Sequence, residues 1–177
     1  RPPRSTLFPS TTLFRSGENF IVYELDAAAR IATVHVGNKC ASGTGEFFLQ
    51  QIRRMSLNSA EAGEQALLDS PYKIADRCSV FSKSDCTHAL NKGTAKGRVV
   101  AGLGRMMAGK ITELLKKTPA KSVLLVGGVA KNKTVTSYLG RDGFNIVIPD
   151  YVDSFEALGA ALWAAEHGKQ WDKTPLF

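Results

Sequence analysis

The chain has 177 residues, of which 44% are hydrophobic, and this suffices to bury the core of one α/β domain or of half a larger one. Its formal net charge is +7, but three arginines lie in the first 16 residues, and without them 20 basic residues face 16 acidic ones. The remaining charge of +4 does not imply a nucleic-acid partner, and no apolar run is long enough to cross a membrane.

The first 16 residues differ in character from the rest. Residues 6–16 read TLFPSTTLFRS, which looks like the translation of a sequencing adaptor, although arginines and serines without acidic residues also resemble a targeting peptide. We interpret residues 1–16 as an unstructured artefact and expect the chain to begin inside a gene. The domain is then expected over residues 17–168, followed by a loosely ordered tail, 169–177.

The first half of the domain reads as two strands followed by helices. Residues 20–25 and 30–36 are β-branched runs that predict a hairpin. Helical spacing predicts helices over residues 45–55, 59–68 with Ser59 as cap, and 78–90. Thr94 is expected to cap a long helix to about Lys117, whose buried stripe consists of Val99, Val100, Leu103, Met106, Met107, Ile111, Leu114 and Leu115.

The second half alternates strands and helices. Residues 122–126 form a continuous apolar run of the kind found in buried parallel strands, and residues 145–148 form another. A helix to about Leu139 lies between them, and Ser154 is expected to cap a helix over 155–167. This order predicts an α/β fold with a parallel or mixed sheet flanked by helices.

Two glycine-containing turns are candidate phosphate sites. Ser42-Gly43-Thr44-Gly45 offers hydroxyls and free N–H groups at a helix start, and Gly127-Gly128-Val129-Ala130 follows a buried strand. Each has a purely structural alternative, a helix cap for the first and tight strand–helix packing for the second. The dinucleotide and P-loop glycine motifs are both absent. Together the two turns favour a nucleotide bound between them.

The three cysteines favour metal or redox chemistry in a reducing, cytoplasmic compartment over disulfide bonds. Cys40 and Cys78 each precede a predicted helix, where unpaired N–H groups favour thiolates. They are 38 positions apart without a Cys-x-x-Cys pair, which disfavours a self-contained zinc or ferredoxin-type site. A two-fold dimer would supply four thiolates. Cys86 lies about 12 Å along the same helix from Cys78 and reads as a buried apolar residue.

At these residues the sequence resembles the activator ATPases of 2-hydroxyacyl-CoA dehydratases and benzoyl-CoA reductases, within the acetate kinase, sugar kinase, chaperone and actin superfamily. The resemblance is carried by residues 38–45 (NKCASGTG), 78–85 (CSVFSKSD), 127–132 (GGVAKN) and 156–161 (EALGAA), in the family's order. It implies that residues 17–168 form the second, C-terminal lobe of a ribonuclease H-like, actin-like ATPase. The variants at Glu18-Asn19 and at residues 83–85 are closer to the long, multidomain activator-like relatives.

The resemblance also implies cofactors and partners. A homodimer would hold one [4Fe-4S] cluster through Cys40 and Cys78 of each subunit, and ATP or ADP with Mg²⁺ would lie in the interdomain cleft. Electrons would come from a ferredoxin- or flavodoxin-like donor and pass to a dehydratase or reductase, driven by ATP hydrolysis. The implied nucleotide-binding residues are Ser42, Gly43, Thr44, Gly45, Gly127, Gly128, Val129, Ala130, Asn132 and Gly159.

Residues 17–20 match the family's second phosphate turn without its aspartate, and the first lobe is missing. The catalytic and magnesium-binding residues are therefore not named, and the fragment alone is expected to be inactive. Two other functions are compatible with the motifs. One is a small-molecule kinase of the same superfamily, such as an amino-sugar kinase, in which the cysteines are incidental. The other is a non-catalytic, nucleotide-responsive binding module.

Overall fold

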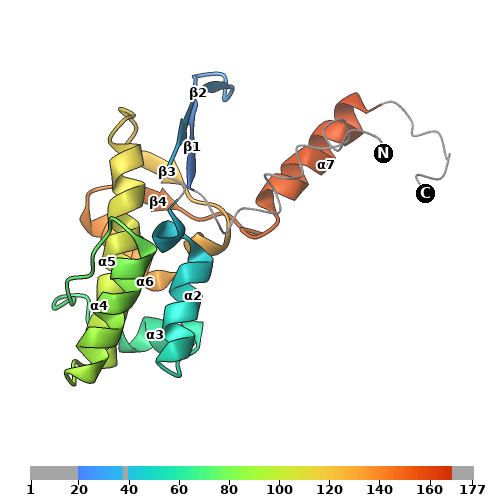
Figure 1. The fold of residues 1–177 in the computed structure, drawn as a ribbon. Coiled ribbons are helices and arrows are strands. Elements are labelled where there is room, and N and C mark those ends of the chain that lie inside the picture. Colours follow the sequence, from blue (N-terminus) through green and yellow to red (C-terminus); the bar gives the residue numbers. More distant parts are fainter. Residues whose placement is uncertain (1–19, 38–39, 169–177) are drawn as a thin grey trace, which may run out of the picture.

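The computed structural model describes residues 20–37 and 40–168 (Figure 1). The adaptor-like stretch, the partial phosphate turn at 17–19, the motif residues Asn38 and Lys39, and the tail lie outside these ranges. The order of elements agrees with the order expected from the sequence. The elements are β1 (Ile21–Leu25), β2 (Ile31–Val36), η1 (Ala41–Gly43), α2 (Gly45–Arg54), α3 (Ser59–Gln65), α4 (Ser79–Asn91), α5 (Lys96–Leu115), β3 (Ser122–Leu124), η2 (Gly128–Lys131), α6 (Lys133–Arg141), β4 (Asn145–Val147) and α7 (Phe155–His167).

The strands form two small sheets. The predicted hairpin is confirmed, since β1 and β2 pair antiparallel, and its turn is closed by a 2.9 Å bond from the Asp26 amide to the Arg30 carbonyl. β3 and β4 pair parallel, with Val123 opposite Ile146. Within the described ranges these are separate two-stranded sheets, one of each kind, in place of one continuous mixed sheet.

Helix α5 forms the centre of the core. All eight residues of its predicted apolar stripe are buried, and side chains from α2, α4 and α6 pack around them in one cluster. The predicted cap is wrong, because α5 begins after Ala95 and has no side-chain cap. The cap predicted for α3 is also wrong, since Asn58 accepts bonds from the amides of Ala60 and Glu61 and forms a capping box with Glu61.

Glycines on α5 allow neighbouring segments to approach its backbone. A Cβ atom at Gly104 would lie 2.3 Å from the Cγ2 atom of Thr134 on α6, which is far inside van der Waals contact. A Cβ atom at Gly102 would lie 2.1 Å from the carbonyl oxygen of Tyr72. The close packing of α6 and of the 66–72 loop on α5 therefore depends on the missing side chains.

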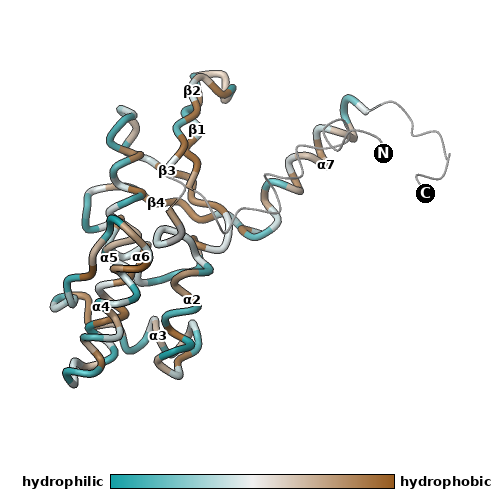
Figure 2. The backbone as a smooth tube through the Cα atoms, in the orientation of Figure 1, coloured by the Kyte–Doolittle hydropathy of each residue, from teal (hydrophilic) through white to brown (hydrophobic). Residues whose placement is uncertain are grey.

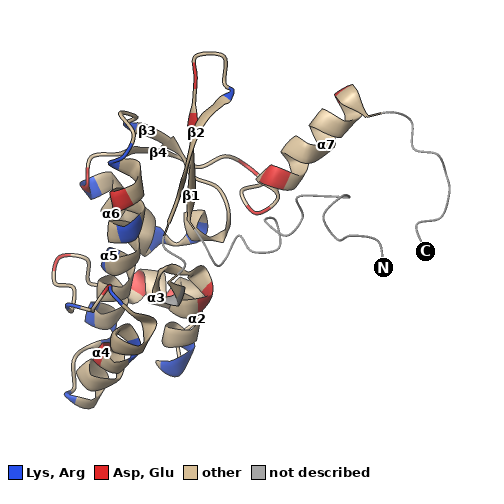
Figure 3. Ribbon diagram, turned by 45° about the horizontal axis from the view of Figure 1, so that its top comes forward, with Lys and Arg blue, Asp and Glu red and all other residues tan. Residues whose placement is uncertain are grey.

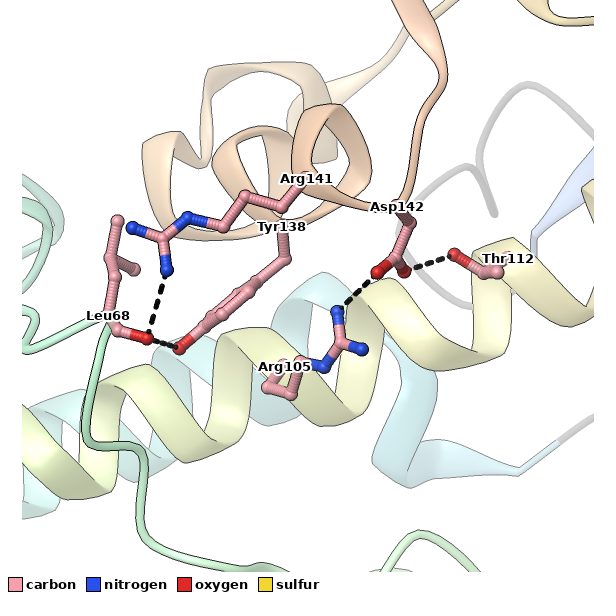
Figure 4. Close-up of polar contacts among 6 residues, drawn as sticks. All are labelled: Leu68, Arg105, Thr112, Tyr138, Arg141 and Asp142. Carbon is pink, nitrogen blue, oxygen red and sulfur yellow. Dashed lines mark hydrogen bonds and ion pairs between the residues drawn. The ribbon is translucent and has the colours of Figure 1, made fainter.

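Polar contacts join α5, α6 and the loop after α3 (Figure 4). Asp142, at the end of α6, accepts hydrogen bonds from Arg105 at 2.7 Å and from Thr112 at 2.9 Å, both on α5. Tyr138 donates a 2.8 Å bond to the carbonyl oxygen of Leu68, and Arg141 reaches the same oxygen. Because α6 directly follows η2, these bonds fix the position of η2 relative to α5.

The sheets and α7 expose apolar residues. The prediction that the run from residue 122 forms a fully buried strand is wrong, because Val123 faces the core while Leu124 is 51% exposed. Figure 2 shows hydrophobic residues along the β1–β2 hairpin as well as in the helical body. Helix α7 projects from that body and has no buried residue (Figure 1). Among the described helices, none is both long and apolar enough to span a membrane.

Candidate functional site

Cys40 and Cys78 lie at the same helix start. Cys78 is the N-cap residue of α4 and has an extended backbone. The sulfur of Cys40 lies 3.9 Å from the carbonyl oxygen of Arg77, the residue before Cys78, and it also interacts with the amide of Ser79. Both thiols are half-buried. The structure therefore brings together two cysteines that are 38 positions apart in the sequence.

The surroundings of Cys40 favour its thiolate. The hydroxyl of Ser42 lies 3.1 Å from the sulfur, and this hydrogen bond is the largest of the effects that lower the pKa of the Cys40 thiol. The amides of Ser42 and Ser79 and the positive charge of Lys110 lower the pKa further, against the opposing effect of burial. A thiolate is the form of cysteine that ligates metals and acts as a nucleophile.

Cys86 has the opposite environment. Its side chain is 3% exposed, and burial raises the pKa of the Cys86 thiol to about 12. It belongs to the apolar core cluster, in agreement with its interpretation as a buried apolar residue. Within residues 20–37 and 40–168 no three His, Cys, Asp or Glu side chains are grouped closely enough to hold a metal ion. One chain therefore offers a pair of accessible thiols.

The turn after Cys40 connects directly to α2. The amide of Gly43 bonds to the carbonyl oxygen of Cys40 at 3.0 Å, and Thr44 caps α2 by accepting a 3.1 Å bond from the Phe47 amide. Ser42 is fully buried beside the thiol. Of the four predicted phosphate-binding residues, Gly45 lies closest to the free N-terminus of α2, where backbone N–H groups attract anions.

The second glycine turn is open to solvent. Gly127 has φ +81°, a conformation that favours glycine, and its amide bonds to the carbonyl oxygen of Val152 at 2.9 Å. A Cβ atom added at Gly127 or at Gly128 would meet no atom within 4 Å. Ala130 is buried, while Asn132 caps α6 by accepting bonds from the amides of Thr134 and Val135. The glycines at the start of the turn are therefore accessible, while its end is fixed by the buried Ala130 and by the Asn132 cap of α6.

The two turns lie side by side. A Cβ atom at Gly45 would lie 4.0 Å from the Cγ2 atom of Val129, so the start of α2 faces η2 at van der Waals distance. The segment 40–45 thus begins at Cys40, beside the start of α4, and ends at Gly45, which faces η2. Gly159 is not part of this arrangement, since it is exposed on α7, away from the helical body (Figure 1).

A lysine beside this site was not recognised in the sequence. Lys110 on α5 lines a cavity of about 110 Å³ together with Cys40 and Gly43. Its ammonium group donates a 2.6 Å bond to the carbonyl oxygen of Asp76. Since these partners are between 34 and 70 positions away in the chain, no local pattern could have indicated the contacts.

The chain matches known proteins over most of its length. The model of the family described as the BadF/BadG/BcrA/BcrD ATPase family matches residues 6–164, a range that begins within the adaptor-like stretch. The 2-hydroxyisocaproyl-CoA dehydratase activator of Clostridioides difficile is 29% identical over 160 residues, which are 89% of this chain and 60% of that protein. One of the benzoyl-CoA reductase subunits of Thauera aromatica is 28% identical over 149 residues, which are 79% of this chain and 53% of that relative.

The fold also matches a solved structure. It is the activator of the 2-hydroxyisocaproyl-CoA dehydratase from Clostridium difficile with bound ADPNP, with a TM-score of 0.77 at 27% identity, over 90% of this chain and 62% of that one. The predicted actin-like α/β fold is thereby confirmed. The chain is related to ATPase activators of 2-hydroxyacyl-CoA dehydratases, and it spans about 60% of the length of the activator it matches.

Proposed function

This chain belongs to the BadF/BadG/BcrA/BcrD ATPase family, and from that premise we propose that it is part of an ATP-dependent activator that delivers low-potential electrons to a partner enzyme. Its residues 17–168 form one lobe of the actin-like ATPase. The partner is an enzyme like the 2-hydroxyacyl-CoA dehydratases or benzoyl-CoA reductases with which the relatives are named. The donor is a small ferredoxin- or flavodoxin-like protein in the same reducing compartment.

One observation carries this proposal. Six consecutive residues, 40–45, connect the two parts of the site. At one end the sulfur of Cys40 lies beside the start of α4, and at the other end Gly45 faces η2. A ligand held between Gly45 and the Gly127–Gly128 turn therefore lies within a short stretch of chain from both cysteines. This proximity suits a protein in which nucleotide binding changes the surroundings of a redox group.

The nucleotide in this proposal is ATP or ADP with Mg²⁺. The N-terminus of α2 supplies free N–H groups and the positive end of the helix dipole, which favour phosphate oxygens. Gly127 and Gly128 leave the space beside η2 free of side chains, so a ligand reaches the backbone there. A related activator binds ADPNP, an ATP analogue, which supports the same role for this chain.

The cysteine pair fits a shared iron–sulfur cluster. A [4Fe-4S] cluster requires four thiolates, and each chain offers Cys40 and Cys78 at one helix start. We therefore assign the cluster to a homodimer, in which a two-fold axis brings the second pair of thiols to the first. When bound, the cluster carries one electron at low potential. The chain's own contribution is to hold the Cys40 sulfur through Ser42 and through the N–H groups at the start of α4.

Nucleotide binding is tested by filling the open space beside η2. Gly128→Leu adds a side chain where the ligand is expected, at a position where an added Cβ atom meets no atom within 4 Å. We expect it to weaken ADPNP binding by about tenfold or more, which corresponds to about 1.4 kcal/mol, measured by titration calorimetry. Gly140→Leu is the matched control, since Gly140 on α6 also has no atom within 4 Å of an added Cβ. Equal binding by both variants would refute the nucleotide assignment.

The cluster is tested by anaerobic reconstitution with iron and sulfide. We expect Cys40→Ser and Cys78→Ser to lose the bound iron, while the buried Cys86 tolerates replacement by alanine without loss. Light scattering is expected to give the mass of a dimer, and an iron assay is expected to give four iron atoms for each dimer. Retention of wild-type iron by either serine variant would rule out the ligand assignment. Phosphoryl transfer to a sugar by the iron-free protein would instead favour a small-molecule kinase.

A further inference from the structure

Lys110 contacts both segments that carry the cysteines. Its ammonium group donates a 2.6 Å bond to the carbonyl oxygen of Asp76, two residues before Cys78. Its methylene groups pack against the turn after Cys40, since a Cβ atom at Gly43 would lie 3.0 Å from its Cδ atom. The half-buried side chain thus crosses from α5 to two segments that are otherwise far apart in sequence.

The other side of the Cys78 segment is held by α4. Ser82 donates a 2.6 Å bond to the carbonyl oxygen of Ala75, and the carboxylate of Asp85 accepts a 2.8 Å bond from the Ala75 amide. Ser82 also bonds to the carbonyl oxygen of Cys78 at 2.9 Å. Both side chains belong to α4, and the Ser82 hydroxyl also lies 3.6 Å from the Met106 sulfur on α5. The start of the loop is joined to α5 by a 2.8 Å bond from the Tyr72 amide to the Arg98 carbonyl oxygen, and Lys110 adds a bond from α5 at Asp76, close to Cys78.

The charge of Lys110 is also placed to act on the Cys40 thiol. Among the described residues no carboxylate lies within ion-pair distance of its ammonium group. It lines the same cavity as Cys40, together with Glu113 and Lys117, which are both exposed. A half-buried cation is screened less by solvent than an exposed one, so its field at nearby anions is stronger.

We propose that Lys110 is a positioning residue for the cysteine pair, which holds the Cys40 and Cys78 segments together and supplies a positive charge beside the Cys40 sulfur. This inference rests on the proposed function for the identity of the bound group. The hydrogen bond to Asp76 is charge-assisted and therefore stronger than a neutral one. The charge stabilises any anionic group that both sulfurs hold, and most strongly its more reduced, more negative state.

The role is tested with Lys110→Met, which keeps much of the apolar packing and removes the charge and the donor. In the iron-free protein we expect faster amide hydrogen exchange at residues 76–82 because the loop loses its bond to α5 at Asp76. In the reconstituted protein we expect less bound iron and a more negative reduction midpoint. Lys110→Arg restores both charge and donor and is expected to recover most of the wild-type midpoint. Lys117→Met, the matched control in the same cavity, is expected to leave exchange at 76–82 unchanged.

The outcomes separate this inference from the proposed function. If wild-type protein binds iron and Lys110→Met matches it in exchange, iron content and midpoint, the role of Lys110 is refuted and the cluster assignment stands. If wild-type protein binds no iron, the proposed function fails, and the exchange rates of the iron-free variants still decide whether Lys110 holds the loop. A Lys117→Met variant that reproduces all effects of Lys110→Met would also overturn the inference. The effects would then follow from the loss of any positive charge near the cavity and not from the contacts of Lys110.

Discussion

The sulfur of Cys40 lies 3.9 Å from the carbonyl oxygen of Arg77, although 37 positions separate the two residues. Arg77 directly precedes Cys78, so this contact brings the first cysteine to the helix start that the second one caps. Between Cys40 and α2 the chain forms η1, a single turn. The geometry of the thiol pair therefore depends on the loops before α2 and α4.

Ser42→Ala is expected to make the Cys40 thiol less reactive. The Ser42 hydroxyl is the largest cause of the lowered pKa of Cys40, so its removal raises that pKa and reduces the thiolate fraction at neutral pH. We expect slower alkylation of Cys40 by iodoacetamide and a shift of the rate profile to higher pH, measured by peptide mass spectrometry on the iron-free protein. Ser84→Ala, an exposed change on α4, is the control, and an unchanged Cys40 profile in Ser42→Ala would contradict the assigned hydrogen bond.

Cys86 is expected to lower the free energy of unfolding as the pH rises through the alkaline range. Burial raises the pKa of its thiol from 9.0 to about 12, so the folded state keeps the proton while the unfolded state loses it above about pH 9. The stabilisation is complete below that pH and is lost as the pH rises toward 12, with a loss of about 2 kcal/mol by about pH 10.5.

The measurement compares urea unfolding of the wild type with that of Cys86→Ala from about pH 7 to about pH 10.5. Lysines and tyrosines titrate in the same pH range in both proteins. Their contribution therefore cancels when the unfolding free energy of Cys86→Ala is subtracted from that of the wild type. We expect the wild type to lose stability relative to the variant only above about pH 9. A difference that is constant across the range would mean that Cys86 is not buried as described.

Gly104→Ala is expected to destabilise the domain although alanine favours helices. The added Cβ atom would lie 2.3 Å from Thr134 Cγ2, so α6 has to move away from α5. Overpacking of this kind costs about 1–3 kcal/mol, which exceeds the helix-propensity gain of about 1 kcal/mol. Gly109→Ala on the same helix meets no atom within 4 Å and is expected to stabilise. Urea midpoints that shift in the same direction for both variants would disprove the close packing.

Much of the fold was predictable because α5 and the hairpin have strong periodicity. The apolar stripe of α5 repeats at helical spacing and is buried throughout, and the β-branched runs pair as expected. Helix starts were less predictable because two candidate caps stood next to each other. Asn58 caps α3 in place of Ser59 because its side chain and that of Glu61 bond reciprocally to the backbone.

The environment of strand β3 could not be predicted from its composition. A run of apolar residues is compatible with burial on one or on both faces, and the choice depends on what packs against the sheet. In this chain Val123 packs on the core while Leu124 stays half exposed. Such an outcome depends on tertiary arrangement, which the local sequence does not contain.

The candidate site was predictable only in parts. Each cysteine and each glycine turn was recognisable from the helix that follows it, as at Cys78 and Gly45. Their convergence was expected from the family resemblance and from the pairing of the two turns, but its geometry was not, because it results from the packing of α2, α4 and η2. The engagement of Ser42 with the thiol was also hidden, since a serine in a glycine turn is as typical of a phosphate site.

Helix α7 presents apolar surface that the rest of the described chain leaves uncovered. Between Glu156 and Glu166 it carries no charged residue (Figure 3). Leu158, Leu162 and Trp163 are exposed on it. Uncovered apolar surface of this kind promotes self-association. We therefore expect self-association through α7 to increase as the concentration of the chain rises.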